Sequence, residues 1–259
     1  MCSSINKDII IDYSLYLKDL GNINQTTQNT YLRHLRVFLY YCMEMEYIKP
    51  FRIKIKNSPV TNKDVYTQSE LEILLKKPDI KKCDFSEYRN WVITNFFLGT
   101  AVRLSTLRNI KISDLDFDNL QISLREVKNK TPYCIPMSNS LKLILIEYLQ
   151  IRKGNLNDYL FCTDYGEQMN KSSIQHAIIR YNNRRGITKT SIHLYRHTFV
   201  KYWLLNEGNI YELQRILGHK SLNMVTKYAN YYGIDLNKNF ESHNILSNIS
   251  NKGKKIHIK

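Results

Sequence analysis

The chain has 259 residues and carries 38 Lys and Arg against 23 Asp and Glu, a formal net charge of +15. A chain of this length can bury a sizeable core and form two domains. Its 43% hydrophobic and 24% charged residues are typical of a globular protein rather than a disordered one. The excess of positive charge favours a polyanionic partner, either nucleic acid or an anionic membrane surface.

The sequence argues against several other classes of protein. No run approaches the ~18 apolar residues that a membrane span needs, and Asp8, Asp12 and Asp19 do not suit a secretory signal. The five cysteines are odd in number, widely spaced and without a CxxC pair, which disfavours a disulfide framework and a cysteine zinc site. We therefore expect a protein of the reduced cytoplasm.

Amphipathic patterns predict a small helical unit at the start of the chain, with helices over residues 8–20 and 26–47. Residues 49–65 contain two prolines and several Asn and Ser, which is typical of a basic linker. We place the domain boundary near residue 63 and expect domains 1–62 and 63–259. The predicted inward-facing residues of the two helices are Ile9, Tyr13, Leu15, Tyr16, Tyr31, Leu35, Phe38, Leu39 and Cys42.

The second region is predicted to be mainly helical, with a small β-sheet. Thr67 and Glu70 form a capping-box signature that opens a helix. Residues 121–127 and 133–137 predict a hairpin around a Lys128–Pro132 turn, and 158–162 a short strand. The expected fold class is mainly α with a small antiparallel β-sheet (α+β). The further helices are predicted at 86–98, 139–152, 171–185, 192–206, 209–217 and 221–231.

One basic segment stands out, because Gln168 to Asn206 contains no Asp or Glu. A solvated surface usually mixes charges of both signs, so a stretch this one-sided predicts a phosphate-contacting surface. Its cationic residues are Lys171, Arg180, Arg184, Arg185, Lys189, Arg196 and Lys201.

Four motifs need a joint explanation. They are Gly99-Thr-Ala-Val-Arg103-Leu-Ser-Thr-Leu107, the turn residue Lys128, His193-Leu-Tyr-Arg196-His197-Thr-Phe199, and Leu217-Gly-His219 with Tyr228 nine residues later. Five of their residues can contact a phosphate, and a sixth is a possible nucleophile. The five are Arg103, Lys128, His193, Arg196 and His219, and the nucleophile is Tyr228.

Together these motifs resemble the tyrosine recombinase (phage integrase) family, and in particular its Xer-type and mobile-element members. The resemblance covers about residues 64–235. It implies a short helical core-DNA-binding domain followed by a catalytic domain. It also implies a site-specific DNA recombinase or integrase that cleaves and rejoins DNA through a 3′-phosphotyrosyl intermediate, with no metal, ATP or other cofactor.

The resemblance implies a role for each motif residue. Arg103 and Arg196 would hold the phosphate, because guanidinium groups bond non-bridging oxygens in pairs. Lys128 would protonate the leaving 5′-oxygen, and His193 and His219 would assist by proton transfer and hydrogen bonding. The unperturbed phenol pKa is near ~10, so Tyr228 would need a cationic pocket and a nearby histidine to be deprotonated.

The chain departs from the family pattern at several positions. Ala101-Val102 stands where the family has a glycine before the first arginine, and Thr106 replaces an acid. Tyr195 replaces a leucine. The N-terminal domain has two clear helices where family members often have four and ~100 residues.

Alternatives stay open for single residues. Lys130 competes with Lys128 as the turn lysine, although Lys128 lies eight residues before Pro136, the Xer-type spacing. His197 is interpreted as structural, packing behind the site. His193 and His197 have the HxxxH spacing of a metal site, but no carboxylate lies nearby in the sequence, so a metal nuclease is disfavoured. Type IB topoisomerase activity and non-catalytic DNA binding remain alternative functions.

The expected partner is double-stranded DNA with a specific recombination site, bound by a homotetramer on bacterial nucleoid DNA and not by a membrane. Residues 234–250 would dock on a neighbouring subunit, as the family resemblance suggests, or pack on their own domain. Their apolar stripe is Leu236, Phe240, Ile245 and Leu246. The candidate DNA contacts are Arg33, Arg36, Lys54, Lys56, Lys171, Arg184 and Arg185, the last two also explicable as helix-end charges.

Overall fold

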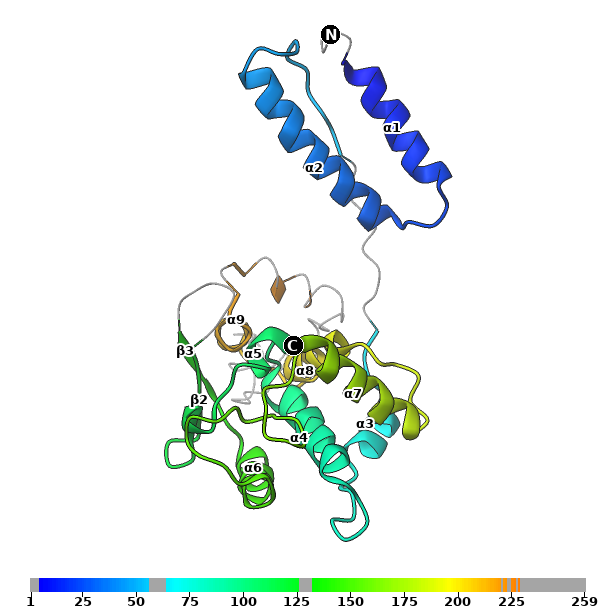
Figure 1. Ribbon diagram of the computed structural model, residues 1–259. Helices are drawn as coiled ribbons and strands as arrows, with labels where there is room; N and C mark the ends of the chain where they lie inside the picture. The colour runs from blue at the N-terminus through cyan, green and yellow to red at the C-terminus, as the bar shows by residue number, and fades with distance from the viewer. Residues whose placement is uncertain are drawn as a thin grey trace, which may run out of the picture. The chain divides into compact units, whose positions relative to one another are not determined.

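The computed structural model of the protein describes residues 5–55, 64–125 and 132–219, together with 221, 222, 225, 226 and 228. The chain divides into two compact units, Met1–Asn62 and Lys63–Lys259. Figure 1 shows the elements of each unit. Within the described part of the chain, no helix is both long and apolar enough to cross a membrane.

The first unit contains helices α1 (Lys7–Asp19) and α2 (Gln25–Glu44), which begin at the N-caps Asn6 and Asn24. Its core is formed by Leu39, Ile48 and Ile53. The segment after α2 therefore completes this core.

Part of the predicted inward face of these helices is wrong. Tyr31 and Phe38 are exposed, whereas Leu32 and Leu39, each one position later, are buried. Both pairs are spaced seven residues apart, so periodicity alone selects either stripe, and packing against α1 and residues 48–55 decides between them. In α1, Leu17 is buried and the predicted residues Ile9, Leu15 and Tyr16 are exposed.

The second unit is built around helix α4 (Phe85–Thr100), which packs against four other helices (Figure 1). These are α3 (Gln68–Leu75), α6 (Asn139–Arg152), α7 (Lys171–Arg184) and α8 (Ile192–Leu205). Val92, Ile93 and Phe96 of α4 are fully buried, so the helix predicted at 86–98 is confirmed as the centre of the core. The Thr67–Glu70 capping box that opens α3 is also confirmed.

The sheet has three antiparallel strands in the order β1 (Leu115–Asp116), β2 (Gln121–Leu124) and β3 (Tyr133–Pro136). It confirms the predicted hairpin and adds β1, which follows the 3-10 helix η2 (Ile112–Asp114). The fold is therefore mainly α with a small antiparallel sheet, as predicted.

The strand predicted at residues 158–162 is wrong, because this segment makes only isolated bridges from Tyr159 to Lys111 and from Cys162 to Gln168. The guanidinium of Arg152 donates hydrogen bonds to the carbonyl oxygens of Tyr159 and Leu160. These carbonyls therefore bond to a side chain rather than to a neighbouring strand.

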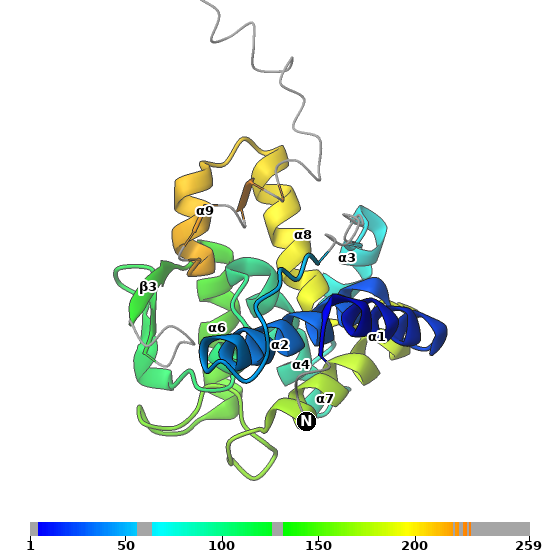
Figure 2. The same cartoon turned by 90° about the horizontal axis from the view of Figure 1, so that it is seen from above.

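Two short helices also belong to the described part of this unit: α5 (Leu104–Leu107) follows α4, and α9 (Ile210–Leu217) follows α8. Figure 2 shows α9 beside α8 and close to β3, in agreement with the contacts between these elements. The turn after α4 and the end of α9 are both brought to α8, and this arrangement positions the site described below.

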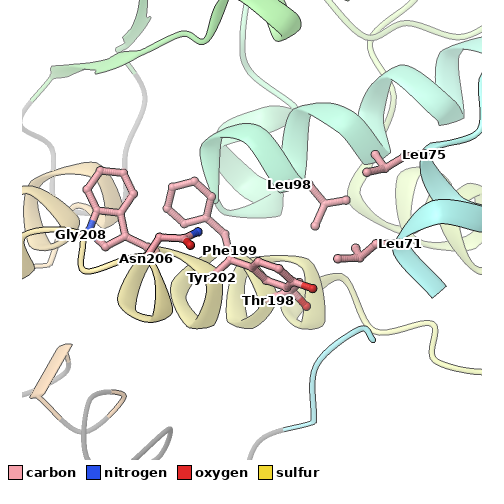
Figure 3. Close-up of a pocket in the computed structure, with 9 residues that line it drawn as sticks. Leu71, Leu75, Leu98, Thr198, Phe199, Tyr202, Asn206 and Gly208 are labelled. Carbon is pink, nitrogen blue, oxygen red and sulfur yellow. The ribbon is translucent and has the colours of Figure 1, made fainter. Parts of the chain in front are cut away.

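An apolar cleft of about 420 Å³ lies between α3, the end of α4 and the outer face of α8 (Figure 3). Its lining includes Leu71 and Leu75 from α3, Leu98 from α4, and Phe199 and Tyr202 from α8. Phe199 and Trp203 of α8 are thus only partly buried, while Leu204 is buried.

Candidate active site

Arg196 is the central residue of the candidate site. It lies on α8 with only 8% of its surface exposed. Its guanidinium donates hydrogen bonds to the carbonyl oxygens of Ala101 (2.6 Å) and Leu217 (2.9 Å), and contacts Nε2 of His219 (2.9 Å). Because a guanidinium has no acceptor, Nε2 of His219 is the acceptor in this contact.

The carbonyls that bond Arg196 come from two helix ends. Ala101 is the C-cap of α4, and Leu217 is the last residue of α9 before the C-cap Gly218. The last carbonyls of a helix have no partner within the helix and carry its partial negative charge. Two such ends therefore compensate a buried cation, and they fix the direction of its side chain.

Arg103 adds a second positive charge close to Arg196. It is half-buried and occupies the N-cap of α5, immediately after the turn that carries Ala101. Burial and then the charge of Arg103 lower the pKa of Arg196 to about 10, while Tyr228 and Tyr133 act in the opposite direction. The guanidinium groups of Arg103 and Arg196, held close together where water is partly excluded, form a binding site for an anion such as a phosphodiester.

Tyr228 lies against α8 and is buried, with 5% of its surface exposed. Its ring belongs to a second apolar cluster that includes Ala101, Val200 and Leu217. Its hydroxyl is 2.9 Å from Nδ1 of His197. The candidate nucleophile thus packs on the same helix and the same α4 turn that hold Arg196.

The remaining predicted residues are placed differently. His193 lies in the first turn of α8 and is exposed. Lys128 and Lys130 lie outside the described residues, as does most of the helix predicted at 221–231, of which Val225, Thr226 and Tyr228 are helical. The structure therefore brings together Arg103, Arg196, His219 and Tyr228.

Comparison with known proteins identifies the family. The model of the phage integrase family matches residues 64–233. The chain belongs to the phage integrase family. Among its relatives, tyrosine recombinase XerC of Chlamydia caviae is 25% identical over 235 residues, covering 88% of this chain and 74% of the relative. Tyrosine recombinase XerA of Thermococcus onnurineus is 29% identical over 201 residues, covering 76% and 67%.

Solved structures of a recombinase and an integrase share the fold. The crystal structure of XerA recombinase aligns with a TM-score of 0.59 at 24% identity, covering 93% of this chain and 84% of that one. The Tn1549 transposon integrase in complex with transposon right end DNA aligns with a TM-score of 0.72 at 20% identity, covering 90% and 82%.

Two departures from the family pattern have a visible structural setting. Ala101, in place of the family's glycine, has φ 52°, in the left-handed region that glycine adopts most easily. Tyr195, in place of leucine, is fully buried, and its hydroxyl donates to Oδ1 of Asn182 (2.8 Å). Nδ2 of Asn182 in turn donates to the Tyr66 hydroxyl (3.0 Å), so a buried polar chain accommodates the larger ring.

Tyr133 is a further residue of the site that the sequence motifs do not predict. This residue begins β3 and packs against Gly218, the residue before His219. Burial raises the pKa of the Tyr133 phenol, while the charges of Arg196 and Arg103 act to lower it, so the phenol lies within reach of both. The only available signal was its place directly after the predicted turn.

Two cations of the acid-free segment are paired with carboxylates from elsewhere in the chain. Arg185, a predicted DNA contact, pairs with Glu87 (2.9 Å) and lies over the Tyr181 ring at 3.7 Å. Lys189 bonds Glu70 (3.0 Å) and the Val65 carbonyl. The acids that pair with these cations come from distant parts of the sequence, so the charge of both residues is partly compensated within the unit.

The other predicted DNA contacts are at the surface or undescribed. Arg33, Lys54, Lys171 and Arg184 are exposed, Arg36 is half-buried, and Lys56 lies outside the described residues. In the first unit, Lys54 lines a cleft together with Lys7, Lys18 and Arg52. The positive charge of this cleft suits a polyanion.

Proposed function

We propose that this member of the phage integrase family is a site-specific DNA recombinase or integrase. It cleaves one DNA strand with Tyr228, holds the 3′ end as a phosphotyrosine ester, and rejoins it to a new 5′ end. The bond energy kept in the ester makes ATP unnecessary, and the two arginines take the place of a metal ion at the phosphate.

The observation that carries this proposal is the geometry of Arg196. Its guanidinium is buried, bonded to two helix ends and to His219, and accompanied by Arg103. A DNA phosphodiester would supply the missing negative charge, and donors already held in place stabilise the charge that develops at phosphorus. Tyr228, packed on the same helix, provides the nucleophile.

The direct test uses a suicide substrate that carries the recombination site and a nick, so that the cleaved product diffuses away. The full-length protein is expected to form a covalent adduct that survives a denaturing gel, and Tyr228→Phe is expected to form none. An adduct with Tyr228→Phe would contradict the assignment of the nucleophile. Cleavage that persists in excess EDTA without nucleotide supports metal and ATP independence, and cleavage abolished by EDTA would contradict it.

The same preparation separates this function from its alternatives. A recombinase yields recombinant products from two sites. Relaxation of supercoiled DNA by a monomer, with no sequence preference and no recombinant, would favour a type IB topoisomerase. DNA binding without cleavage by the wild type would favour a non-catalytic DNA-binding protein.

We further propose that double-stranded DNA is bound by both units and that four copies assemble on two sites. The exposed cations Arg33, Lys54, Lys171 and Arg184 would contact the DNA backbone, so binding is expected to weaken steeply with salt. Residues 234–250 of a neighbouring copy would fill the apolar cleft of Figure 3. The apolar residues Leu236, Phe240, Ile245 and Leu246 of this segment match the apolar lining of the cleft.

A further inference from the structure

His197 contacts the reacting atom of the candidate nucleophile. Its Nδ1 lies 2.9 Å from the Tyr228 hydroxyl, and the two ring centroids are 5.5 Å apart. His197 is half-buried on α8, next to Arg196. The sequence motifs favour a structural role for His197 and proton transfer by His193 and His219.

Those two histidines are less suited to take the Tyr228 proton. The Nε2 lone pair of His219 already accepts a hydrogen bond from Arg196. His193 is exposed, one helical turn before His197. The Tyr228 ring, in contrast, is buried among apolar residues, where a free phenolate is disfavoured. A group already in contact with the hydroxyl is best placed to take its proton, and Nδ1 of His197 is such a group.

We propose that His197 is the catalytic base that accepts the proton of Tyr228 during strand cleavage. The inference rests on the proposed recombinase function. Neutral His197, with its proton on Nε2, presents the Nδ1 lone pair to the phenol. Arg196, held by Ala101 and Leu217, keeps the phosphate next to the same turn of α8.

The step is balanced in atoms and charge. The Oη–H bond of Tyr228 breaks as Nδ1–H forms on His197, and Oη bonds to phosphorus as the bond to the 5′-oxygen breaks. That oxygen takes a proton from an acid, for which Lys128 is the expected residue. On rejoining, the 5′-hydroxyl gives its proton back to the conjugate base of that acid as its oxygen bonds to phosphorus, and the imidazolium of His197 returns its proton to the departing Tyr228 oxygen.

Titratable and charged groups lie near His197 on its own helix and around its chain neighbour Arg196. Arg196 and Lys201 lie on the same helix, Lys201 one turn later. Arg103 from the α4–α5 turn, His219 after α9 and Tyr133 from β3 face Arg196.

The test measures single-turnover adduct formation by the full-length protein on the suicide substrate across pH. Two variants separate a base from a structural residue. His197→Ala removes the imidazole, whereas His197→Asn places an amide near the position of Nδ1, where it keeps a hydrogen bond but cannot take up a proton. His176→Ala, at an exposed histidine of α7, is the matched control. Thermal unfolding and DNA binding are measured for each variant.

A catalytic base predicts that both His197 variants cleave about 10²-fold more slowly or worse, with DNA binding retained. It also predicts that added imidazole restores part of the rate of His197→Ala, and that the fall in rate at acidic pH weakens in His197→Asn. A His197→Asn rate equal to wild type, or faster cleavage by His197→Ala, overturns the proposal. If the wild type forms no adduct, the recombinase function itself fails.

Discussion

Tyr133 packs so closely against Gly218 that a β-carbon added there would lie 2.6 Å from the Tyr133 hydroxyl. Gly218 also has φ +61°, in the left-handed region, and is the C-cap of α9. Both features require glycine, because other residues strain this backbone and would displace the phenol. The contact ties the second strand of the hairpin to His219, and so to Arg196.

Gly218→Ala is expected to lower the free energy of unfolding by about 1–2 kcal/mol, from the left-handed backbone and the clash together. It should also slow cleavage, because His219 shifts relative to Arg196. The double variant Gly218→Ala/Tyr133→Phe should recover part of both losses, since the closest atom is removed while the backbone strain remains. Chemical denaturation and adduct formation measure the two effects. Equal losses in the single and double variants would contradict the role of the Tyr133 contact.

Arg196→Ala is expected to reduce the rate of adduct formation by about 10²–10³-fold or more, the effect of losing a positioned donor to a developing charge. It should also lower thermal stability, because the carbonyls of Ala101 and Leu217 lose their buried donor. Arg196→Lys should restore part of the stability and little of the rate, since an ammonium lacks the planar fork. Arg180→Ala, at an exposed position of α7, is the control for stability and should unfold at the same temperature as the wild type.

The Tyr195–Asn182 hydrogen bond should stabilise the core. Asn182→Leu leaves the buried Tyr195 hydroxyl without its acceptor and is expected to cost about 1–3 kcal/mol. Tyr195→Phe removes the donor of the same hydrogen bond. If the bond is responsible, the double variant loses less stability than the sum of the single variants. Strict additivity in denaturant unfolding would show that the two residues do not interact.

The ionised Glu70 carboxylate should add to the free energy of unfolding near neutral pH, and this contribution should be lost in acid. Burial acts to raise the pKa of Glu70, but hydrogen bonds from Thr67 and Lys189 outweigh it and hold the pKa below its ordinary value. A folded-state pKa below the unfolded one stabilises the fold above about pH 4.3 and loses this effect as pH falls. Glu70→Gln keeps the capping box, so it should cost about 1 kcal/mol near neutral pH and little at pH 3.

Thermal unfolding of Glu70→Gln between pH 3 and 7 checks this expectation. Glu72→Gln, on the exposed side of α3, serves as the control for charge removal alone. A difference from the wild type that stays constant with pH would rule out the ion pair with Lys189 as its source.

The apolar cleft should be needed for assembly and not for DNA binding by one copy. Leu75→Lys places a charge at the partly exposed rim of the cleft. It is expected to abolish synaptic tetramers while single-site binding persists, as should truncation after Gly233. Leu143→Lys, at a more exposed leucine of α6, is the matched control. Native gels and light scattering of DNA complexes distinguish the species, and tetramers formed by the truncated chain would contradict docking of residues 234–250.

Local features were predictable from the sequence because they depend on residues a few positions apart. The capping box of α3, the buried helix around Phe96 and the hairpin of β2 and β3 each arise from spacing, capping or alternation. The order of the motifs around Arg103, Arg196 and Tyr228 was likewise enough to suggest the family. The prediction of a strand at 158–162 is wrong because the guanidinium of Arg152, which lies outside that segment, donates hydrogen bonds to a backbone carbonyl of the segment.

The fold class, the family and the residue types of the candidate site follow from the order and spacing of the residues. Which cations remain available to an anion depends on how the helices pack, since Arg185 pairs with Glu87 and Lys189 with Glu70, both far away in the chain. Packing also brings Tyr228 to His197 and Tyr133 to Gly218. Helical spacing fixes contacts three or four residues apart, whereas contacts between distant segments exist only once the helices pack.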